Sequence, residues 1–409
     1  MEWKTAIPRS LDLTEATTKL LEEQESRFSG NCDGEGIRTD MVRVASLQPV
    51  EDDLSCGTMD VGSGKSWLYW GVYDGHSGWF TSKILASFLT KYVSRKLAQL
   101  PESVMQDLIV VEEAIKSAFL ELDNEILSNA LAALHEPISH AEAISRLGPA
   151  SSGSCALLAM YDPRDSMVRV ASAGDSRAVL GRPGFRDSSS WTCIPLSTDH
   201  TGLDPGERER ILAEHPGEEN LISPAGRLLG SAVTRSFGDN RWKWTLEELE
   251  DWRGRFFGRT GPRNIKSPPY LTALPTVTMK QVHPGDFLIL ASDGFWNHMS
   301  SDDAVHCVSL WVDTQKRIGL DVDTNTNTTA GIKYASASTT KESGPCEGYP
   351  YNWIVKRENF IVEDDNVATH LVRNAFGGKD RNLFCSVLST IPPEAKEARD
   401  DVTVVVVMF

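Results

Sequence analysis

The sequence predicts a protein of α-helices and antiparallel β-strands, and three observations carry this prediction. Short apolar runs at 156–160, 167–173 and 178–180 are separated by turn residues, as neighbouring antiparallel strands are. Two longer segments, 79–100 and 104–134, repeat apolar residues at helical spacing. The chain has 409 residues, more than the roughly 250–300 at which a single core stops growing, so one large domain with insertions and two domains are both allowed.

The first 40 residues read as a lead-in to the main domain. Residues 11–26 have the composition of a short acidic helix, and the stretch 30–40 is polar and contains glycine. Strand-like sequence begins near Met41, so we expect the main domain to span 41–409. The further elements expected within it are strands at 67–74, 277–282, 287–293 and 402–409 and helices at 301–312 and 366–375.

Two insertions interrupt this pattern. From about 200 to 275 the sequence is long and polar, with a helix start at 204–207 and a stretch rich in Trp and Arg. We interpret it as a flap over the functional site, which selects a substrate or docks a partner. The segment from about 321 to 348 is rich in Thr, Ser, Asn and Gly and is expected to be a low-complexity surface loop.

Charge and cysteine content exclude several classes of protein. The net charge of 41 − 57 = −16 argues against nucleic acid and anionic membranes as partners. No apolar run approaches the ~20 residues of a membrane-spanning helix. The seven cysteines show no CxxC spacing, which favours a reducing compartment.

The N-terminus has neither a signal-peptide core nor an Arg-rich transit composition, so we expect a cytosolic chain or a missing presequence.

Acidic residues stand at the ends of four apolar strand-like runs. Asp74 follows one run and is succeeded by Gly75, Asp175 and Asp293 follow two more, and Asp400 precedes the last. A single Asp-Gly pair is ordinary turn chemistry, because Asp bonds its own backbone and Gly tolerates positive φ. Two Asp-Gly turns and two further acidic turns, all beside apolar runs far apart in the chain, instead favour a site for hard divalent cations, which need carboxylate oxygens from several segments. The sequence therefore predicts a Mg²⁺ or Mn²⁺ site.

Two further features belong to this candidate site. Glu51 and Asp52 follow the first strand region, and His76 lies two residues after Asp74, where it can give or take a proton. Two cations sharing a carboxylate would activate a bridging water for attack on a phosphoester. The chain contains no GxxxxGK[ST], GxGxxG or GxSxG motif that would point to another phosphate chemistry.

At this point the motifs resemble those of a known family, the metal-dependent (PPM, type 2C) protein serine/threonine phosphatases. The segments that carry the resemblance are, in order, VEDD (50–53), WGVYDGHSG (70–78), SSGSCALLA (151–159), ASAGDSRAVLG (171–181), LSTDHT (196–201), GRLLGSAVTRSFGD (226–239), DFLILASDGFW (286–296) and RDDVTVVVV (399–407). Within the family, EDDNVATHLVRNAFGG (363–378), FFGRT (256–260) and the Pro after Gln48 resemble the mitochondrial pyruvate dehydrogenase phosphatase branch of fungi and animals.

The resemblance implies an α+β fold, a four-layer α-β-β-α sandwich of two antiparallel sheets flanked by helices, with two Mg²⁺ or Mn²⁺ ions at one edge. It implies that Asp74 bridges both metals and that His76 protonates the leaving serine or threonine oxygen. The other implied ligands are Asp293 and Asp400 for one metal, Glu51 and the Gly75 carbonyl for the second, Asp52 in the second shell, and Asp175 for a third metal.

Two positions depart from the wider family. Asn297 stands where a third-metal Asp is expected, which puts that metal in doubt. Leu47 stands where a phosphate-gripping Arg is expected, a departure that the pyruvate dehydrogenase phosphatase branch shares. Arg43 is a candidate substitute for that Arg, although an ordinary surface Arg is the commoner case.

We therefore expect an active phosphatase for phosphoserine and phosphothreonine, with the E1 component of pyruvate dehydrogenase as substrate. One alternative is a catalytically weak scaffold that binds phosphoproteins, and another is a cytosolic signalling phosphatase of the same family. The branch resemblance implies the mitochondrial matrix, whereas the N-terminus favours the cytoplasm. A regulatory subunit and the oligomeric state are left open.

Overall fold

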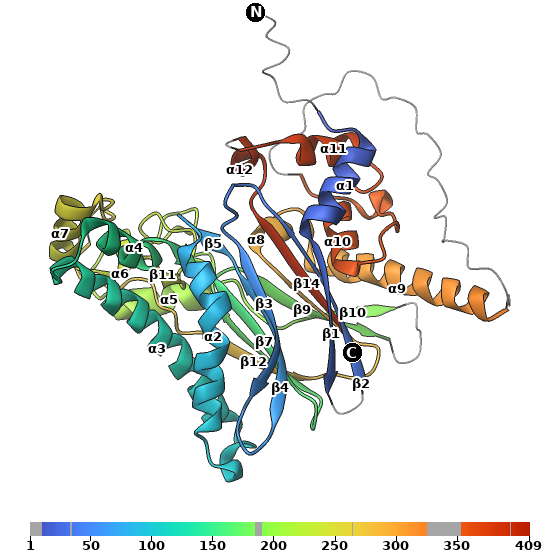
Figure 1. The fold of residues 1–409 in the computed structure, drawn as a ribbon, viewed down its shortest axis with the longest axis horizontal. Coiled ribbons are helices and arrows are strands. Elements are labelled where there is room, and N and C mark those ends of the chain that lie inside the picture. Colours follow the sequence, from blue (N-terminus) through green and yellow to red (C-terminus); the bar gives the residue numbers. More distant parts are fainter. Residues whose placement is uncertain (1–9, 33–34, 185–189, 264, 325–352, 393) are drawn as a thin grey trace, which may run out of the picture.

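The computed structural model describes residues 10–32, 35–184, 190–263, 265–324, 353–392 and 394–409 (Figure 1). Two large antiparallel sheets form its centre. The six-stranded sheet has the order β1 (Glu25–Cys32), β2 (Glu35–Val44), β14 (Val402–Met408), β13 (Phe287–Ala291), β9 (Arg177–Pro183) and β10 (Trp191–Pro195). The five-stranded sheet has the order β12 (Thr276–Gln281), β8 (Met167–Ala173), β7 (Ala156–Asp162), β4 (Ser66–Tyr73) and β3 (Asp53–Asp60).

The central strands of both sheets are buried on both faces, which explains their near-continuous hydrophobic runs. Successive side chains of a strand point to opposite faces. In β13, Leu288 and Leu290 therefore join the core between the sheets, whereas Ile289 joins the core beneath the helices. In β7 the same alternation sends Leu157 between the sheets and Leu158 outward. The two sheets thus pack face to face.

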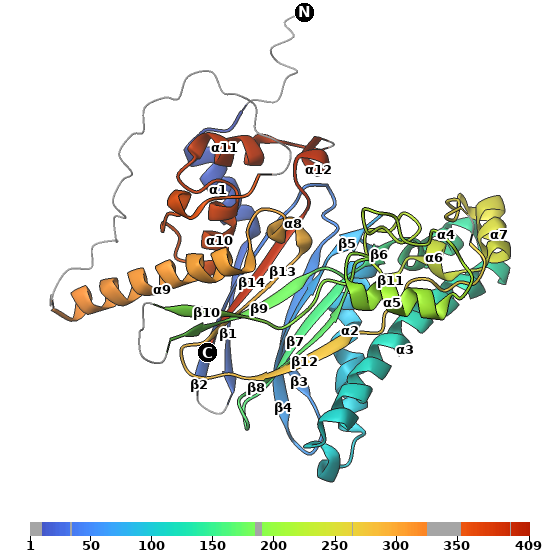
Figure 2. The ribbon, with the colours of Figure 1, turned by 180° about the vertical axis from the view of Figure 1, so that it is seen from behind.

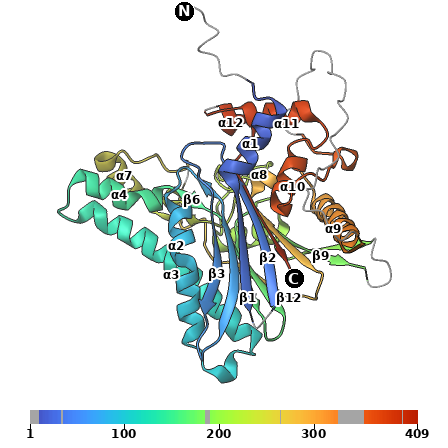
Figure 3. The same ribbon diagram turned by 45° about the vertical axis from the view of Figure 1, so that its right-hand side comes forward.

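Helices cover the outer face of each sheet and complete four layers (Figures 1 and 3). The five-stranded sheet is covered by α2 (Phe80–Ala98), on which α3 (Leu108–His135) and α4 (His140–Ser151) pack. The six-stranded sheet is covered by α1 (Leu13–Gln24), α9 (Ser301–Thr324) and α10 (Val367–Ala375), and α11 (Arg381–Ser389) packs on α1. The α+β sandwich expected from the sequence is therefore confirmed.

Shorter elements connect these layers. A small sheet joins β11 (Phe237–Gly238), β6 (Gly153–Ser154) and β5 (Gly75–His76). The remaining helices are α5 (Pro205–Glu214), α6 (Asn240–Lys243), α7 (Leu246–Phe256), α8 (Asp293–Trp296) and α12 (Glu394–Ala398), with 3-10 turns at Glu102–Val104 and Arg357–Asn359. None of the helices in the described ranges is long and apolar enough to cross a membrane.

The structure differs from the sequence prediction at the N-terminus. The polar residues after α1 were expected to be a lead-in, but they form β1 and most of β2, so the sheet begins at Glu25 and not near Met41. Strand β2 pairs with the C-terminal strand β14 from Arg38 to Val44, for example Val42 with Val404. Because the ladder supplies partners to the backbone, a polar segment can be a strand. The lead-in is therefore shorter than expected.

The two insertions have different outcomes. In the 200–275 segment, α5 begins where the sequence indicated, and the Asp204 side chain accepts a hydrogen bond from the Glu207 amide at 2.9 Å. Helices α6 and α7 of this segment pack beside α3 and α4 (Figure 2). Of the 321–348 segment, the first four residues continue α9 to Thr324. Residues 325–348 lie outside the described residues.

Candidate metal centre

Three carboxylates from three strand ends meet at one edge of the sandwich. Asp74 follows β4, Asp175 follows β8 and Asp293 follows β13, and one oxygen of each lies within 4.8 Å of the others. The first two strands belong to the five-stranded sheet and the third to the six-stranded sheet, so both sheets contribute. The Asp293 amide also donates to Asp74 Oδ2 at 3.3 Å. This grouping of acidic oxygens suits a hard divalent cation.

The crowding of these carboxylates perturbs their protonation. Burial, followed by the negative charge of Asp293, raises the pKa of Asp74 well above its usual range. Burial, followed by Asp175 and Asp400, raises the pKa of Asp293 to about 7. Burial also raises the pKa of Asp175. Bound cations would relieve this repulsion, because they favour the ionised carboxylates.

Glu51 and Asp400 lie close to one another and share a lysine. The Gly78 amide donates to Glu51 Oε1 at 2.6 Å, and Lys396 Nζ lies 3.5 Å from Glu51 Oε2. Lys396, on α12, also donates to Asp400 Oδ1. Although burial opposes it, the nearby Asp400 carboxylate raises the pKa of Lys396 above its usual range. Lys396 could not be predicted as part of the site, because a Lys in the segment EAKEARDD gives no sign that it faces a carboxylate.

The backbone beside Asp74 comes very close to the segment that carries Glu51. A Cβ atom at Gly75 would lie 2.0 Å from the carbonyl oxygen of Glu51, a distance that real Cβ atoms essentially never show. Only glycine therefore allows this approach, which brings the turn after β4 against the segment before β3. Both of these segments carry predicted ligands.

Asp52 is buried beside the cluster. Its Oδ2 accepts a hydrogen bond from Thr403 Oγ1 at 2.7 Å, whereas its buried Oδ1 has no hydrogen-bond partner among the described residues. Burial, followed by the charge of Asp401, raises the pKa of Asp52 well above its usual range. A buried oxygen without a partner is costly, so this atom fits a role in binding a water of a cation's outer shell.

Asp401 holds the segment that carries Glu51 and Asp52. Its Oδ1 accepts from the Ser46 amide at 2.5 Å and from Ser46 Oγ at 2.7 Å, and its Oδ2 accepts from the Glu51 amide at 2.7 Å. A carboxylate with several amide donors is a strong anchor. The two adjacent acids therefore divide their tasks, since Asp400 faces Lys396 and Asp401 fixes the chain before β3.

His76 is paired with Asp239, which the sequence analysis did not select. The His76 Nε2 to Asp239 Oδ2 distance is 2.7 Å, and Ser236 Oγ donates to the same oxygen at 2.6 Å. Burial alone would lower the pKa of His76, but the Asp239 carboxylate outweighs it and raises the pKa to about 9. The ring is therefore protonated near neutral pH. A Cβ at Gly153 would lie 2.2 Å from His76 Nε2, so the pair packs closely against β6.

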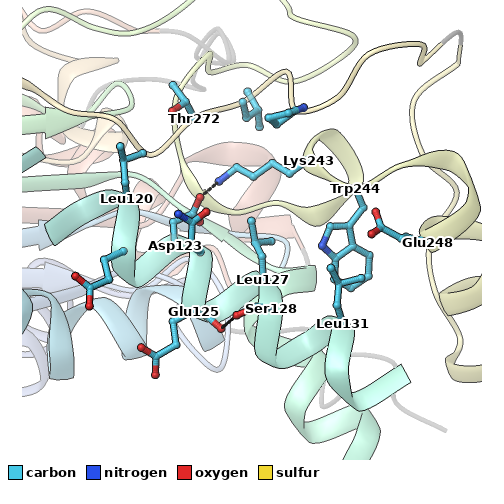
Figure 4. A pocket seen from close by; sticks show the side chains of 14 residues that line it. Leu120, Asp123, Glu125, Leu127, Ser128, Leu131, Lys243, Trp244, Glu248 and Thr272 are labelled. Carbon is cyan, nitrogen blue, oxygen red and sulfur yellow. Dashed lines mark hydrogen bonds and ion pairs between the residues drawn. The ribbon is translucent and has the colours of Figure 1, made fainter. Parts of the chain in front are cut away.

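A buried ion pair supports Asp239 from behind. Asp123 on α3 accepts from the Gly238 amide at 2.8 Å and from Lys243 Nζ at 2.6 Å. Figure 4 shows this pair in the wall of a cavity of about 620 Å³ between α3 and the 243–272 segment. None of the predicted ligands lines that cavity. Its contribution to the candidate site is indirect, through the turn that carries Asp239.

Leu47, Asn297 and Arg43, which bear on the two departures from the family pattern, make the following contacts. Leu47 lines a cavity of about 50 Å³ with Lys19 and Thr390, neither of which is a predicted ligand. The backbone N–H of Asn297, which caps the C-terminal end of α8, donates to the backbone carbonyl of Asp293 at 2.8 Å. Arg43 donates to the Asp52 carbonyl at 3.1 Å and to Asp53 Oδ1 at 2.9 Å.

Comparison with known proteins identifies a family and several relatives of this chain. The protein phosphatase 2C family matches residues 42–344. A protein phosphatase 2C homolog of Schizosaccharomyces pombe is 37% identical and covers 96% of this chain and 84% of its own. Mitochondrial pyruvate dehydrogenase (acetyl-transferring) phosphatase 1 of Saccharomyces cerevisiae is 33% identical and covers 96% of this chain and 72% of its own.

A solved structure shares the fold. The crystal structure of serine-threonine phosphatase 2C from Toxoplasma gondii has a TM-score of 0.52 and 15% identity, and it covers 94% of this chain and 98% of its own. The resemblance found in the sequence, including that to the pyruvate dehydrogenase phosphatase branch, is confirmed by the family match and the relatives. The chain belongs to the protein phosphatase 2C family, whose members are metal-dependent serine/threonine protein phosphatases.

Proposed function

We propose that the chain is an active Mg²⁺- or Mn²⁺-dependent phosphatase for phosphoserine and phosphothreonine in proteins. The meeting of Asp74, Asp175 and Asp293 from three strand ends is the observation that carries the proposal. The proposed ligands are Asp74 for both metals, Asp293 and Asp400 for one, and Glu51 and the Gly75 carbonyl for the other. Asp52 acts in the second shell, and Asp175 belongs to a third site, for which Asn297 stands in place of an expected carboxylate.

The residues fit the chemistry of phosphoester hydrolysis. Two divalent cations, when bound, would supply an activated water for attack on phosphorus and would offset the charge of the phosphate. The attack breaks the bond between phosphorus and the serine or threonine oxygen, and that oxygen needs a proton. His76, protonated near neutral pH, is the donor. Its Nε2 is held by Asp239, so Nδ1–H remains for the leaving oxygen.

The phosphorylated E1 component of pyruvate dehydrogenase is the proposed substrate, and the mitochondrial matrix is the proposed location. The name of the Saccharomyces cerevisiae relative supports both proposals. The branch-specific segments in the sequence support them independently. The pyruvate dehydrogenase complex would then be the physiological partner.

Phosphate release tests the proposal. The substrates are a phosphothreonine peptide and phosphorylated pyruvate dehydrogenase E1, each with Mg²⁺, with Mn²⁺ and with EDTA. We expect metal-dependent turnover that Asp293→Asn lowers by at least about 100-fold, because it removes a charged ligand. Asp107→Asn is the matched control, since Asp107 only caps α3 and Asn caps helices equally well.

The outcomes separate the two parts of the proposal. Turnover of E1 well above that of the peptide supports the assigned substrate, whereas equal turnover contradicts it. If neither Mg²⁺ nor Mn²⁺ supports turnover of any substrate, the enzymatic proposal is contradicted and a phosphoprotein-binding scaffold is favoured.

A further inference from the structure

A pocket of about 240 Å³ lies beside the candidate metal centre. Two of its lining residues, Val50 and Asp52, are the chain neighbours of Glu51, so the hollow shares a wall with the proposed ligands. The pocket is also lined by three charged side chains and one aromatic side chain, those of Arg43, Asp53, Lys83 and Trp79. We call this hollow the flanking pocket.

The flanking pocket presents more positive than negative charge to solvent. Arg43 donates to Asp53 Oδ1 at 2.9 Å, and Lys83 Nζ lies 3.2 Å from Asp53 Oδ2, so two cations share one carboxylate. The side chains of Arg43 and Lys83 are 33% and 63% exposed, whereas that of Asp53 is 13% exposed. The Asp52 carboxylate is buried and accepts a hydrogen bond from Thr403. This local excess of positive charge contrasts with the net charge of −16 of the chain.

One wall of the pocket is aromatic. Trp79 is 37% exposed and stacks on Phe80, with ring centroids 4.2 Å apart. It directly follows Gly78, whose amide binds Glu51. An exposed aromatic ring next to two cations suits an Asp or Glu side chain, whose methylene groups can pack on the ring while its carboxylate meets the cations.

We propose that the flanking pocket binds an Asp or Glu side chain of the phosphoprotein substrate, a few residues from the phosphorylated residue. The inference rests on the proposed function, because it names the substrate class of the same site. The incoming carboxylate would pair with Lys83, whose side chain is 63% exposed beside its ion pair with Asp53, and with N–H groups of Arg43 other than those on Nη1, the nitrogen that donates to Asp52 and Asp53. Charge at the rim of a binding site selects partners and orients them.

A phosphopeptide series tests this inference. The peptides share one phosphothreonine in an alanine background, and a single Asp occupies in turn each position up to four residues away. We expect wild type to prefer Asp over Ala by about fivefold in kcat/KM at one or two neighbouring positions, the size typical of an exposed ion pair.

Charge variants assign the preference to the pocket. Lys83→Gln should abolish the preference for Asp, and Lys83→Glu should reverse it in favour of a peptide with Lys at the same position. Lys91→Glu, on the exposed face of the same helix but outside the pocket, makes the same change of net charge and should keep the preference. The preference is a ratio of kcat/KM values for two peptides with one enzyme, so a general change in turnover, measured with p-nitrophenyl phosphate, cancels from it.

Two results would overturn the inference alone, with peptide turnover intact. One is the absence of any Asp preference in wild type, and the other is an equal loss of preference in Lys83→Glu and Lys91→Glu. Absence of turnover of every peptide and of p-nitrophenyl phosphate would overturn the proposed function, and this inference with it.

Discussion

His76 takes its orientation from a carboxylate that lies 163 residues further along the chain. Asp239 is buried and has a left-handed backbone conformation, with φ of 53° and ψ of 46°. The Asp123–Lys243 pair fixes the preceding Gly238 amide, and Ser236 bonds the carboxylate itself. A residue that acts through the catalytic acid in this way is a positioning residue.

The variant Asp239→Asn tests this role. Removing the charge takes away the main cause of the raised His76 pKa, so that pKa should fall toward its usual value near 6.5. The alkaline limb of the kcat profile should then move to lower pH, and kcat near neutral pH should fall about 10- to 100-fold. Rates of phosphate release between pH 6 and pH 10 measure both effects.

The control is Ser236→Ala, which removes the other partner of Asp239 and leaves the charge beside His76 unchanged. It should shift the alkaline limb much less. An unchanged pH profile in Asp239→Asn, with circular dichroism like that of wild type, would contradict the assignment of His76 as the acid.

At the scale of elements, α5 anchors the segment that leads to Asp239. Glu207, in the first turn of α5, accepts hydrogen bonds from Arg235 Nε at 3.0 Å, from Thr234 Oγ1 at 2.5 Å and from Arg210 at 2.8 Å. Burial alone would raise the pKa of Glu207, but these donors outweigh it and hold the pKa well below its usual range. The 200–275 segment therefore contributes to the site through a buried ion cluster.

The variant Glu207→Gln should lower the free energy of unfolding by about 3 kcal/mol at pH 7, because it leaves buried guanidinium groups without their counter-charge. A carboxylate with a depressed folded pKa stabilises the fold above its unfolded pKa, about 4.3, and this contribution is lost as the pH falls toward the folded pKa. The difference between wild type and variant should therefore shrink from pH 7 to pH 3. Urea unfolding at the two pH values measures it, and a difference independent of pH would contradict the account.

At the scale of the whole molecule, the two sheets end at one edge, and that edge carries the candidate site. The sequence was sufficient to predict that Asp74, Asp175 and Asp293 end apolar strands, because each follows a run too apolar to be anything but a core element. It was also sufficient to predict α10 and β14, whose patterns are unbroken. These features depend on local sequence, which is why they could be predicted.

Other features depend on contacts between distant segments and could not be predicted in this way. Strand β1 and the start of β2 are polar, and their strand conformation depends on pairing with each other and with β14. Asp239 lies in a turn, Ser-Phe-Gly-Asp, that gives no sign of facing His76. Asp401 directly follows the predicted ligand Asp400, and the sequence gives no sign that its carboxylate bonds the chain at Ser46 and Glu51.

Direct binding of Mn²⁺ tests the central claim that this edge is a metal centre. Titration calorimetry on wild type should give saturable binding of two ions per chain. Asp74→Asn, which removes the shared carboxylate, should weaken binding by at least about tenfold. Its unfolding midpoint in EDTA should be no lower than that of wild type, because the substitution relieves the repulsion among the crowded carboxylates. Binding that is absent in wild type, or that is equal in wild type and a correctly folded Asp74→Asn variant, would contradict it.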